Sequence, residues 1–258
     1  MPGRDWTRDE LIVAFNLYCR IPFGRIHIRN PEIIDLAKVL GRTPSSVSWK
    51  LANFARLDPA LQKRRIRGAT HGSKAEEEIW EEFHQNWDAL AFESQRLMAE
   101  LKGVPPEALV PSEIFPEGRT REAMVKTRLN QAFFRSAVLA AYDCKCCVTG
   151  LSIPEVLTAS HIVPWAVDTK NRTNPRNGLC LNAVHDRAFD CGLVTVSPDY
   201  RFRISSVPKK RIDSGDEVRQ SLFLKYEGKE IALPSRFLPD GVFLNYHNVH
   251  VFRDARKM

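Results

Sequence analysis

Six residues that interrupt helices fall between positions 103 and 118 of this 258-residue chain. They are Gly103, Pro105, Pro106, Pro111, Pro116 and Gly118. Because proline lacks a backbone N–H and clashes with the preceding helical turn, no regular helix can cross this stretch. Each of the two remaining parts is long enough to bury a core of its own. The sequence therefore predicts a first domain at 1–102, a linker at 103–120 and a second domain at 121–258.

The charge of the chain is distributed unevenly along its length. The total is +7, from 38 basic and 31 acidic residues. Residues 1–74 carry a net charge of +8, residues 75–102 carry −6 and residues 103–258 carry +5. Lysine and arginine neutralise phosphates and release their counterions, so the two basic regions favour a polyanionic partner such as nucleic acid.

Composition argues against several other classes of protein. No apolar run approaches the roughly 18 residues of a membrane-spanning helix, and charged residues occur throughout the N-terminal region, unlike a secretory signal. Six cysteines in a chain of this length, without a signal peptide, are typical of a reducing compartment rather than of a disulfide framework. We therefore expect a cytoplasmic protein with no membrane partner.

Local signals predict three helices in the first domain. Apolar residues recur with a helical period over 11–18, and Thr7 is a suitable N-cap for them. Asn30-Pro31 begins a second helix, which Gly41 ends, and Thr43-Pro44 begins a third. We expect these three helices to form the start of a helical domain.

The second and third of these helices are joined by a short turn that contains glycine. This arrangement is typical of the helix-turn-helix, whose second helix can lie in the major groove of DNA. The residues predicted to contact DNA there are Arg42, Ser45, Ser46, Trp49 and Lys50. The alternative is a small helical bundle with a basic surface.

The remainder of the first domain contains a basic and an acidic segment. Residues 63–67 form a basic cluster, which is either a solvated face or an arm that contacts phosphates. Residues 74–101 predict one long helix with a regular apolar stripe. Five glutamates near its start would repel DNA, so we expect this helix to pack on the preceding helices or on a partner subunit.

The second domain combines helices with short strands. In chain order we predict a helix at 121–142, strands at 147–151, 157–163 and 178–181, a helix at 182–189, and a hairpin formed by 192–196 and 201–204. Two strands followed by a helix, with histidines on the strand and on the helix, form a compact ββα unit. The predicted fold class is therefore α+β, with a helical N-terminal domain followed by this unit.

Three segments of the second domain closely resemble the HNH endonucleases. They are Ala159–Trp165, Asn174–Leu179 and His185–Asp190, which contain His161, Asn177 and His185 in the order and spacing of that family. More narrowly, the chain is similar to predicted restriction endonucleases with a C-terminal HNH nuclease. The resemblance implies a ββα-metal fold and a metal-dependent endonuclease that cuts double-stranded DNA in restriction or defence.

The resemblance also implies a role for each of the three residues. His161 is the general base, His185 is a metal ligand, and Asn177 holds the connecting loop and orients His161. Phosphodiester hydrolysis independently needs a group that titrates near neutral pH, which histidine provides, and a cation that stabilises the developing charge.

One position departs from the family pattern. Many members place Asp or His immediately before the general base as a second metal ligand, whereas this chain has Ser160. A hydroxyl is a poor ligand, so we expect His185 to hold the metal together with water, Ser160 and substrate phosphate. Asp186 or Asp190 could also supply the missing carboxylate. Such an oxygen-rich site favours Mg²⁺ or Mn²⁺, although a histidine ligand also tolerates Zn²⁺ or Ni²⁺.

Basic residues of the second domain are predicted to contact DNA phosphates. They are Arg128, Arg135, Arg172, Arg176 and Arg187. Because a ββα centre usually nicks one strand, cleavage of a duplex predicts a homodimer or paired binding.

Alternatives remain open for the function and for the cysteines. The chain could be a non-catalytic DNA-binding or regulatory protein whose HNH site has decayed, for which Ser160 is the main support. It could also be a nonspecific nuclease that cuts DNA or RNA. Five cysteines lie between residues 144 and 191, and we favour free buried thiols over a structural zinc site because the second pair lacks the CxxC spacing.

Overall fold

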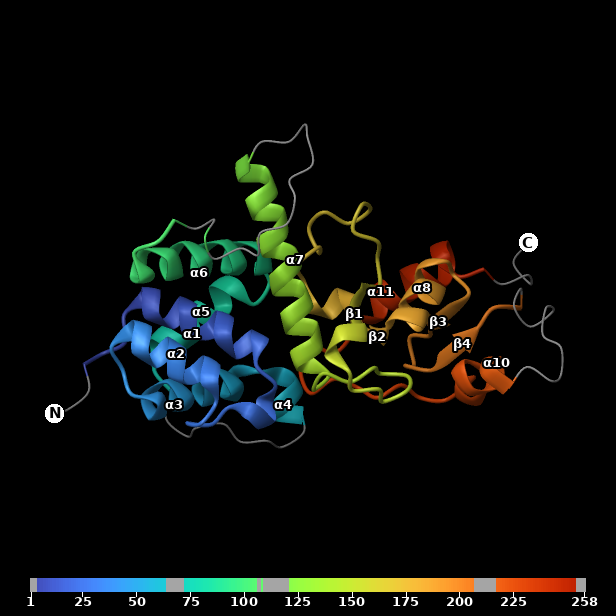
Figure 1. Ribbon diagram of the computed structural model, residues 1–258, viewed down its shortest axis with the longest axis horizontal. Coiled ribbons are helices and arrows are strands. Elements are labelled where there is room, and N and C mark those ends of the chain that lie inside the picture. The colour runs from blue at the N-terminus through green and yellow to red at the C-terminus, as the bar shows by residue number, and fades with distance from the viewer. Residues whose placement is uncertain (1–3, 64–71, 106–107, 109–120, 207–216, 254–258) are drawn as a thin grey trace. The chain divides into compact units, whose positions relative to one another are not determined.

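The computed structural model describes residues 4–63, 72–105, 108, 121–206 and 217–253 (Figure 1). The chain divides into two compact units, Met1–Ala141 and Tyr142–Met258. The first unit is helical and the second contains two small sheets, which confirms the predicted α+β class. Most of the basic cluster at 63–67 and most of the predicted linker at 103–120 lie outside the described residues.

The first unit begins with four helices at the predicted positions or immediately after them. They are α1 (Arg8–Arg20), α2 (Pro31–Leu40), α3 (Pro44–Leu57) and α4 (Pro59–Lys63), with a 3-10 turn at Phe23–Arg25. Thr7 and Glu10 form a reciprocal capping box at the start of α1. Gly41, with φ 62°, ends α2 in the left-handed region, and Thr43 caps α3. Short-range capping chemistry therefore determines these boundaries.

An aromatic cluster forms part of the core of the first unit. The ring of Phe15 in α1 lies 4.9 Å from that of Phe54 in α3 and 5.2 Å from that of Trp80. Phe15 and Phe54 are completely buried. Their burial attaches α3 to α1 through the hydrophobic effect.

The prediction of one long helix over 74–101 is wrong. Two helices occupy this stretch, α5 (Lys74–Phe83) and α6 (Trp87–Lys102). Asn86 interrupts the run because its side chain accepts a hydrogen bond from the Ala89 N–H and caps α6. The apolar stripe continues from one helix into the next, which is why the periodicity alone suggested a single element.

Helix α7 (Arg121–Ala141) is grouped with the first unit, although the sequence prediction assigned these residues to the second domain. It packs against α1 and α6, and the ring of Phe133 lies 6.1 Å from that of Trp87. The predicted linker precedes α7, whereas the division between the compact units follows it.

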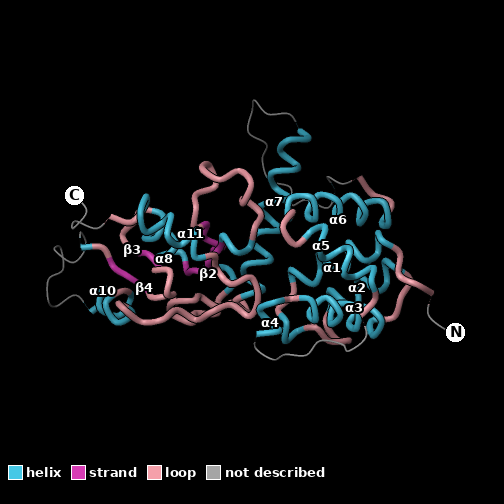
Figure 2. The backbone as a smooth tube through the Cα atoms, turned by 180° about the vertical axis from the view of Figure 1, so that it is seen from behind, coloured by secondary structure: helices cyan, strands magenta, loops and turns pink. Residues whose placement is uncertain are grey.

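The second unit contains the predicted ββα arrangement. Strands β1 (Leu157–His161) and β2 (Gly178–Asn182) are antiparallel, with His161 opposite Gly178, and α8 (Ala183–Asp190) follows directly. The connection between the two strands is the long pink loop beside β2 in Figure 2. It includes a 3-10 turn at Pro175–Asn177, and another such turn at Pro154–Val156 precedes β1.

The rest of the second unit packs around this core. The hairpin of β3 (Val194–Val196) and β4 (Phe202–Ile204) matches the prediction. It is followed by α10 (Glu217–Leu222), a 3-10 turn at Leu224–Tyr226, α11 (Gly241–Tyr246) and a π-helical turn at His247–Val251.

The prediction of a strand at 147–151 is wrong. This segment forms a turn in which the Gly150 N–H donates to the Cys146 carbonyl at 2.8 Å, with Gly150 at φ 75°. The short apolar run therefore ends in a tight turn that requires glycine. Across the described part of the chain, no helix has the length and apolar character needed to span a membrane.

Candidate active site

His161 lies at the end of β1, where its ring is held by the connecting loop. The Nε2 atom is 2.9 Å from the carbonyl oxygen of Arg172. Because a carbonyl only accepts, Nε2 carries the hydrogen and Nδ1 carries the lone pair. Burial lowers the pKa of His161, and the Arg172 charge lowers it further, while the bond to the Arg172 carbonyl partly offsets both effects. These surroundings favour the neutral ring, which is the state that can accept a proton.

Asn177 holds the two ends of the connecting loop together. Its buried side-chain oxygen accepts a hydrogen bond from the Val163 N–H at 2.8 Å. Its amide nitrogen donates to the carbonyls of Val163 and Asn171 at 3.2 and 3.3 Å. The asparagine thus fixes the backbone immediately after His161.

The surroundings of His185 do not support the predicted role as a metal ligand. The ring is completely buried, and its Nε2 lies 2.7 Å from the Leu222 carbonyl, to which it donates a hydrogen bond. Its Nδ1 lies 3.1 Å from the Asn182 side-chain nitrogen, from which it accepts. Since a metal ligand must offer a lone pair, both nitrogens are already committed to the protein interior.

Two carboxylates on α8 lie on a different face from His185. Asp186 and Asp190 are one helical turn apart, and Ser160 of β1 is the neighbour of Asp186. Burial raises the pKa of Asp186, whereas Ser160 and Arg187 lower it in part. Burial and then the charge of Asp186 raise the pKa of Asp190. The two carboxylates therefore repel each other, and a bound cation would relieve this repulsion.

Ser160 completes this oxygen-rich face, to which we refer as the carboxylate face of α8. Its hydroxyl is buried and has no hydrogen-bond partner among the described residues, and its proximity lowers the pKa of Asp186. Among the described residues, no three histidine, cysteine or acidic side chains gather into a metal cluster. The carboxylate face thus offers two carboxylates and a hydroxyl, which suits a hard cation that keeps water in its remaining positions.

Of the five arginines predicted to contact phosphates, three belong to the second unit, and they lie in different environments. Arg172 donates through Nε to the Trp165 carbonyl at 2.8 Å, and its guanidinium carbon lies 5.1 Å from the centre of the Trp165 ring. Arg176 forms an ion pair with Asp240 at 3.0 Å. Arg187 is exposed and close enough to Asp186 for its charge to lower the pKa of that carboxyl. Only Arg187 combines exposure with proximity to the carboxylate face.

In the first unit, the structure corrects the prediction that Arg42 is an exposed DNA contact. Its side chain is 6% exposed, pairs with Glu10 at 2.7 Å and lies over the ring of Trp6 at 4.2 Å. Burial raises the pKa of Glu10, but hydrogen bonds from Arg42, the Thr7 backbone and Arg4 outweigh it, so the pKa is lowered overall. The Arg42 side chain therefore fastens the N-terminal segment to the helices.

Lys50 is also engaged inside the first unit. Its ammonium pairs with Glu76 of α5, a residue with no exposed surface, and lies 5.2 Å from the centre of the Trp6 ring. Of the other predicted contacts on α3, Ser45 is exposed and Ser46 is half-buried. The side chain of Trp49 is 63% exposed. The basic part of the predicted recognition helix is thus covered by α5, while an uncharged part of it remains open.

Two of the predicted DNA contacts belong to α7, in the first unit. Arg128 is half-buried and Arg135 is exposed. Neither is brought together with His161 inside one compact unit, because that histidine belongs to the second unit.

All six cysteines are free, and three of them are buried near the ββα core. Cys146 lies 4.0 Å from Nδ1 of His185 and 3.6 Å from the side-chain nitrogen of Asn182. Burial raises the pKa of Cys146, but its interactions with His185 and Thr149 outweigh this effect and lower the pKa to about 7. The contact between Cys146 and His185 could not be predicted from local patterns, since the two residues are 39 positions apart in the chain.

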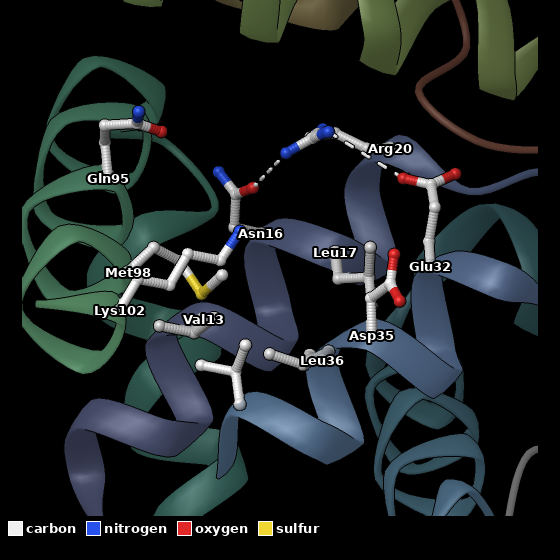
Figure 3. A pocket seen from close by; sticks show the side chains of 11 residues that line it. Val13, Asn16, Leu17, Arg20, Glu32, Asp35, Leu36, Gln95, Met98 and Lys102 are labelled. Carbon is white, nitrogen blue, oxygen red and sulfur yellow. Dashed lines mark hydrogen bonds and ion pairs between the residues drawn. The ribbon is translucent and has the colours of Figure 1, made fainter. Parts of the chain in front are cut away.

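The first unit also contains a cavity of about 290 Å³ between α1, α2 and α6 (Figure 3). Leu17, Leu36 and Met98 contribute apolar surface, and Arg20 forms an ion pair with Glu32 at 3.8 Å. The cavity contains none of the residues that could hydrolyse a phosphodiester, so it is not part of the candidate active site.

Comparison with known proteins supports the assignment of the ββα unit. Residues 146–197 match the family model described as HNH endonuclease. This segment contains His161, Asn177 and the whole carboxylate face of α8. No curated protein matches the chain. The match over residues 146–197 identifies an HNH endonuclease domain in the second unit, as the sequence predicted.

Proposed function

We propose that the protein is a metal-dependent DNA endonuclease that acts in restriction or defence. The observation that carries the proposal is the geometry of His161, whose Nε2 is held by the Arg172 carbonyl in the same ββα unit as the carboxylate face of α8. The restriction role rests on the resemblance of the sequence to restriction endonucleases with a C-terminal HNH domain.

In this proposal, His161 acts as the general base. The Nδ1 lone pair takes a proton from the attacking water, and the Nε2 hydrogen bond to Arg172 keeps the ring in the required tautomer and orientation. Arg187, exposed beside the carboxylates, binds a phosphate oxygen of the substrate.

HNH nucleases generally use a divalent metal, and the carboxylate face is where this chain would hold it. Asp186 and Asp190 would provide charged ligands, and Ser160 would provide a neutral oxygen. The cation would stabilise the negative charge that develops on the phosphate and the leaving oxygen. Oxygen ligands favour Mg²⁺ or Mn²⁺ over Zn²⁺ or Ni²⁺, since both nitrogens of His185 already have protein partners.

We propose that the first unit holds the DNA. Because Arg42 and Lys50 are committed to Glu10 and Glu76, contact through α3 would depend on Ser45, Ser46 and the backbone N–H groups of its first turn. The exposed Arg135 on α7 would add a phosphate contact.

The test is cleavage of supercoiled plasmid with Mg²⁺ or Mn²⁺, comparing the wild type with His161→Ala. We expect the wild type to cut and the variant to lose at least about 100-fold in rate, the contribution of a positioned general base. Equal cutting by both proteins would refute the assignment of His161. Single-stranded DNA and RNA are assayed in parallel, and a preference for RNA would favour the nonspecific nuclease.

A wild type that binds duplex DNA but cuts no substrate with Mg²⁺, Mn²⁺, Zn²⁺ or Ni²⁺ would favour the non-catalytic regulator. Sequencing the ends produced from modified and unmodified genomic DNA would then test the restriction role of an active enzyme. Cutting that is independent of base modification and of sequence would contradict that role.

A further inference from the structure

The loop between β1 and β2 closes a ring of contacts around His161. We infer that Trp165 and Arg172 are positioning residues for His161, and that Arg172 acts through its backbone carbonyl and its stacking on the indole rather than as a phosphate clamp. This inference rests on the proposed function, because it assigns to His161 the role of general base.

The ring of contacts consists of four interactions between three residues. His161 Nε2 lies 2.9 Å from the Arg172 carbonyl, and Arg172 Nε donates to the Trp165 carbonyl at 2.8 Å. The Arg172 guanidinium lies 5.1 Å from the centre of the Trp165 ring. The Trp165 ring in turn meets His161 edge-on, with centroids 5.4 Å apart and an interplanar angle of 86°. Arg172 and Trp165 thus restrain each other, and both contact His161, Arg172 through its carbonyl and Trp165 through its ring.

The cation–π geometry explains how the Arg172 carbonyl is kept in place. A guanidinium that lies over an indole ring is attracted by it, and the attraction is stronger when the pair is shielded from water. Both side chains are half-buried here. The hydrogen bond from Arg172 Nε to the Trp165 carbonyl also restricts the orientation of the guanidinium. The backbone of residue 172 is therefore fixed relative to residue 165. The carbonyl that holds His161 belongs to this same backbone.

The rest of the loop is fixed independently of this pair. The Asp168 carboxylate accepts hydrogen bonds from the Asn171 backbone and side chain at 3.2 and 2.7 Å. Asn177 holds the carbonyl of Asn171 at 3.3 Å. Replacement of Trp165 should therefore disturb the orientation of the Arg172 carbonyl without unfolding the loop.

The same contacts argue against Arg172 as a phosphate clamp. An arginine that binds a phosphate directs its N–H groups toward the substrate, and its guanidinium must be able to move with the phosphate. Arg172 instead directs Nε to a backbone carbonyl, and its guanidinium lies over an indole ring. Movement toward a phosphate would break both contacts and release the carbonyl that orients His161.

The experiment uses the full-length protein and separates orientation from binding. The variants are Trp165→Ala, Trp165→Phe, Arg172→Lys and Arg172→Ala, with Thr169→Ala as a control at an exposed position of the same loop. Single-turnover cleavage rates are measured with Mn²⁺, and duplex affinity is measured over a series of salt concentrations with EDTA present. Thermal unfolding checks that each variant is folded.

We expect Trp165→Ala and Arg172→Lys to cut roughly 10- to 100-fold more slowly while the dissociation constant for DNA changes by less than about twofold. Trp165→Phe keeps an aromatic face and edge, so it should recover most of the rate. Thr169→Ala should behave as the wild type.

A second measurement does not depend on cleavage. The tautomer of His161 is read from the ¹⁵N imidazole spectrum, with its signals assigned from the spectrum of His161→Gln. The wild type should show the Nε2–H form, and Trp165→Ala should show a mixture of both forms. If the wild type cuts nothing but the tautomer still depends on Trp165, the endonuclease proposal fails and the positioning role stands.

An unchanged tautomer in both Trp165→Ala and Arg172→Lys would overturn the inference. Weaker DNA binding by Arg172→Ala, with a salt dependence reduced by about one phosphate contact and an undisturbed tautomer, would instead establish a phosphate clamp.

Discussion

His185 and Asp186 are adjacent in the chain but face different surroundings. His185 points into a pocket of Phe202, Phe223 and Tyr226 rings, with centroids 5.2 to 6.1 Å from its own. Asp186 points toward Ser160 on β1. The position in the family pattern suggested the histidine as metal ligand, but its side chain is used to attach α10 through the Leu222 carbonyl.

We therefore expect the metal requirement to follow Asp186 rather than His185. Asp186→Asn should raise the Mn²⁺ concentration for half-maximal cleavage at least about 10-fold, since it removes a charged ligand. His185→Gln should leave that concentration within about twofold. His185→Leu, which removes the donor to the buried Leu222 carbonyl, should lower the free energy of unfolding by about 1–3 kcal/mol. Metal titration of cleavage and urea denaturation measure the two effects, and the reverse pattern would restore His185 as the ligand.

The burial of His247 leads to a separate prediction about how the free energy of unfolding depends on pH. It is 1% exposed, stacks on Phe189 at 3.6 Å and contacts Thr195 Oγ1 at 2.8 Å. Burial lowers its pKa to about 4, from an ordinary value of 6.5, although a hydrogen bond to the Phe189 carbonyl opposes this shift. The unfolded chain therefore binds a proton between these pH values while the folded chain does not.

Since the unfolded state binds more protons, stability falls as the pH is lowered through this window. His247 should account for a loss of about 2 kcal/mol between pH 7.5 and pH 5. Denaturant unfolding at both pH values checks this, and His247→Gln should lose about that much less stability on acidification. The exposed His250 provides the control, because His250→Gln should keep the pH dependence of the wild type. An identical pH dependence in His247→Gln would contradict the assignment.

At the scale of elements, boundaries fixed by one or two neighbouring residues could be predicted from the sequence. Thr7, Asn30, Gly41 and Thr43 mark helix ends through hydrogen bonds or left-handed conformations that depend on local residue types. The break at Asn86 was missed because the apolar stripe continues through it, and periodicity cannot distinguish one helix from two that share a core.

Predictions at the candidate site fail or hold for similar reasons. The ββα order and the place of His161 depend on local spacing and could be predicted. The environments of Arg42, Lys50 and His185 depend on partners 26 to 37 residues away, so no local pattern contains them. Trp165 was missed although it follows His161 by only four residues, because an aromatic residue in a loop has no fixed meaning without its contacts.

The packing of α5 on α3 leads to a prediction about stability. Glu76 has no exposed surface. Its carboxylate pairs with the Lys50 ammonium and accepts a hydrogen bond from the Asn53 side-chain nitrogen at 2.8 Å. Glu76→Ala should lower the free energy of unfolding by about 3–5 kcal/mol, because it leaves a largely buried ammonium without its partner. Its neighbour Glu77 pairs with Arg56 on the surface, so Glu77→Ala should cost at most about 1 kcal/mol.

Urea denaturation of the two variants measures this difference. Equal effects of the two substitutions would contradict a buried role for Glu76. Because Glu76 neutralises Lys50 inside the fold, part of the basic charge of the first 74 residues is not available to a polyanion.

At the scale of the whole molecule, a net charge of +7 is an incomplete guide to DNA binding. If the chain binds DNA as proposed, exposed cations such as Arg187 would provide the phosphate contacts, since Arg42 and Lys50 are paired internally. Arg42→Gln should therefore reduce stability while leaving the salt dependence of DNA binding nearly unchanged. A salt dependence reduced by about one contact in a folded Arg42→Gln protein would return this residue to the DNA interface.

The number of active centres sets the last expectation. The described residues contain one ββα unit with His161 and the carboxylate face, and in the proposed endonuclease such a centre would cut one strand in each binding event. Limiting enzyme should therefore accumulate nicked plasmid, and the linear product should rise more steeply than in proportion to enzyme concentration as two chains act on one site. Plasmid cleavage over a range of enzyme concentrations, together with sedimentation with and without DNA, measures this dependence. Linear product that forms without a nicked precursor at the lowest concentration, from a chain that sediments as a monomer on DNA, would require a second cutting centre within one chain.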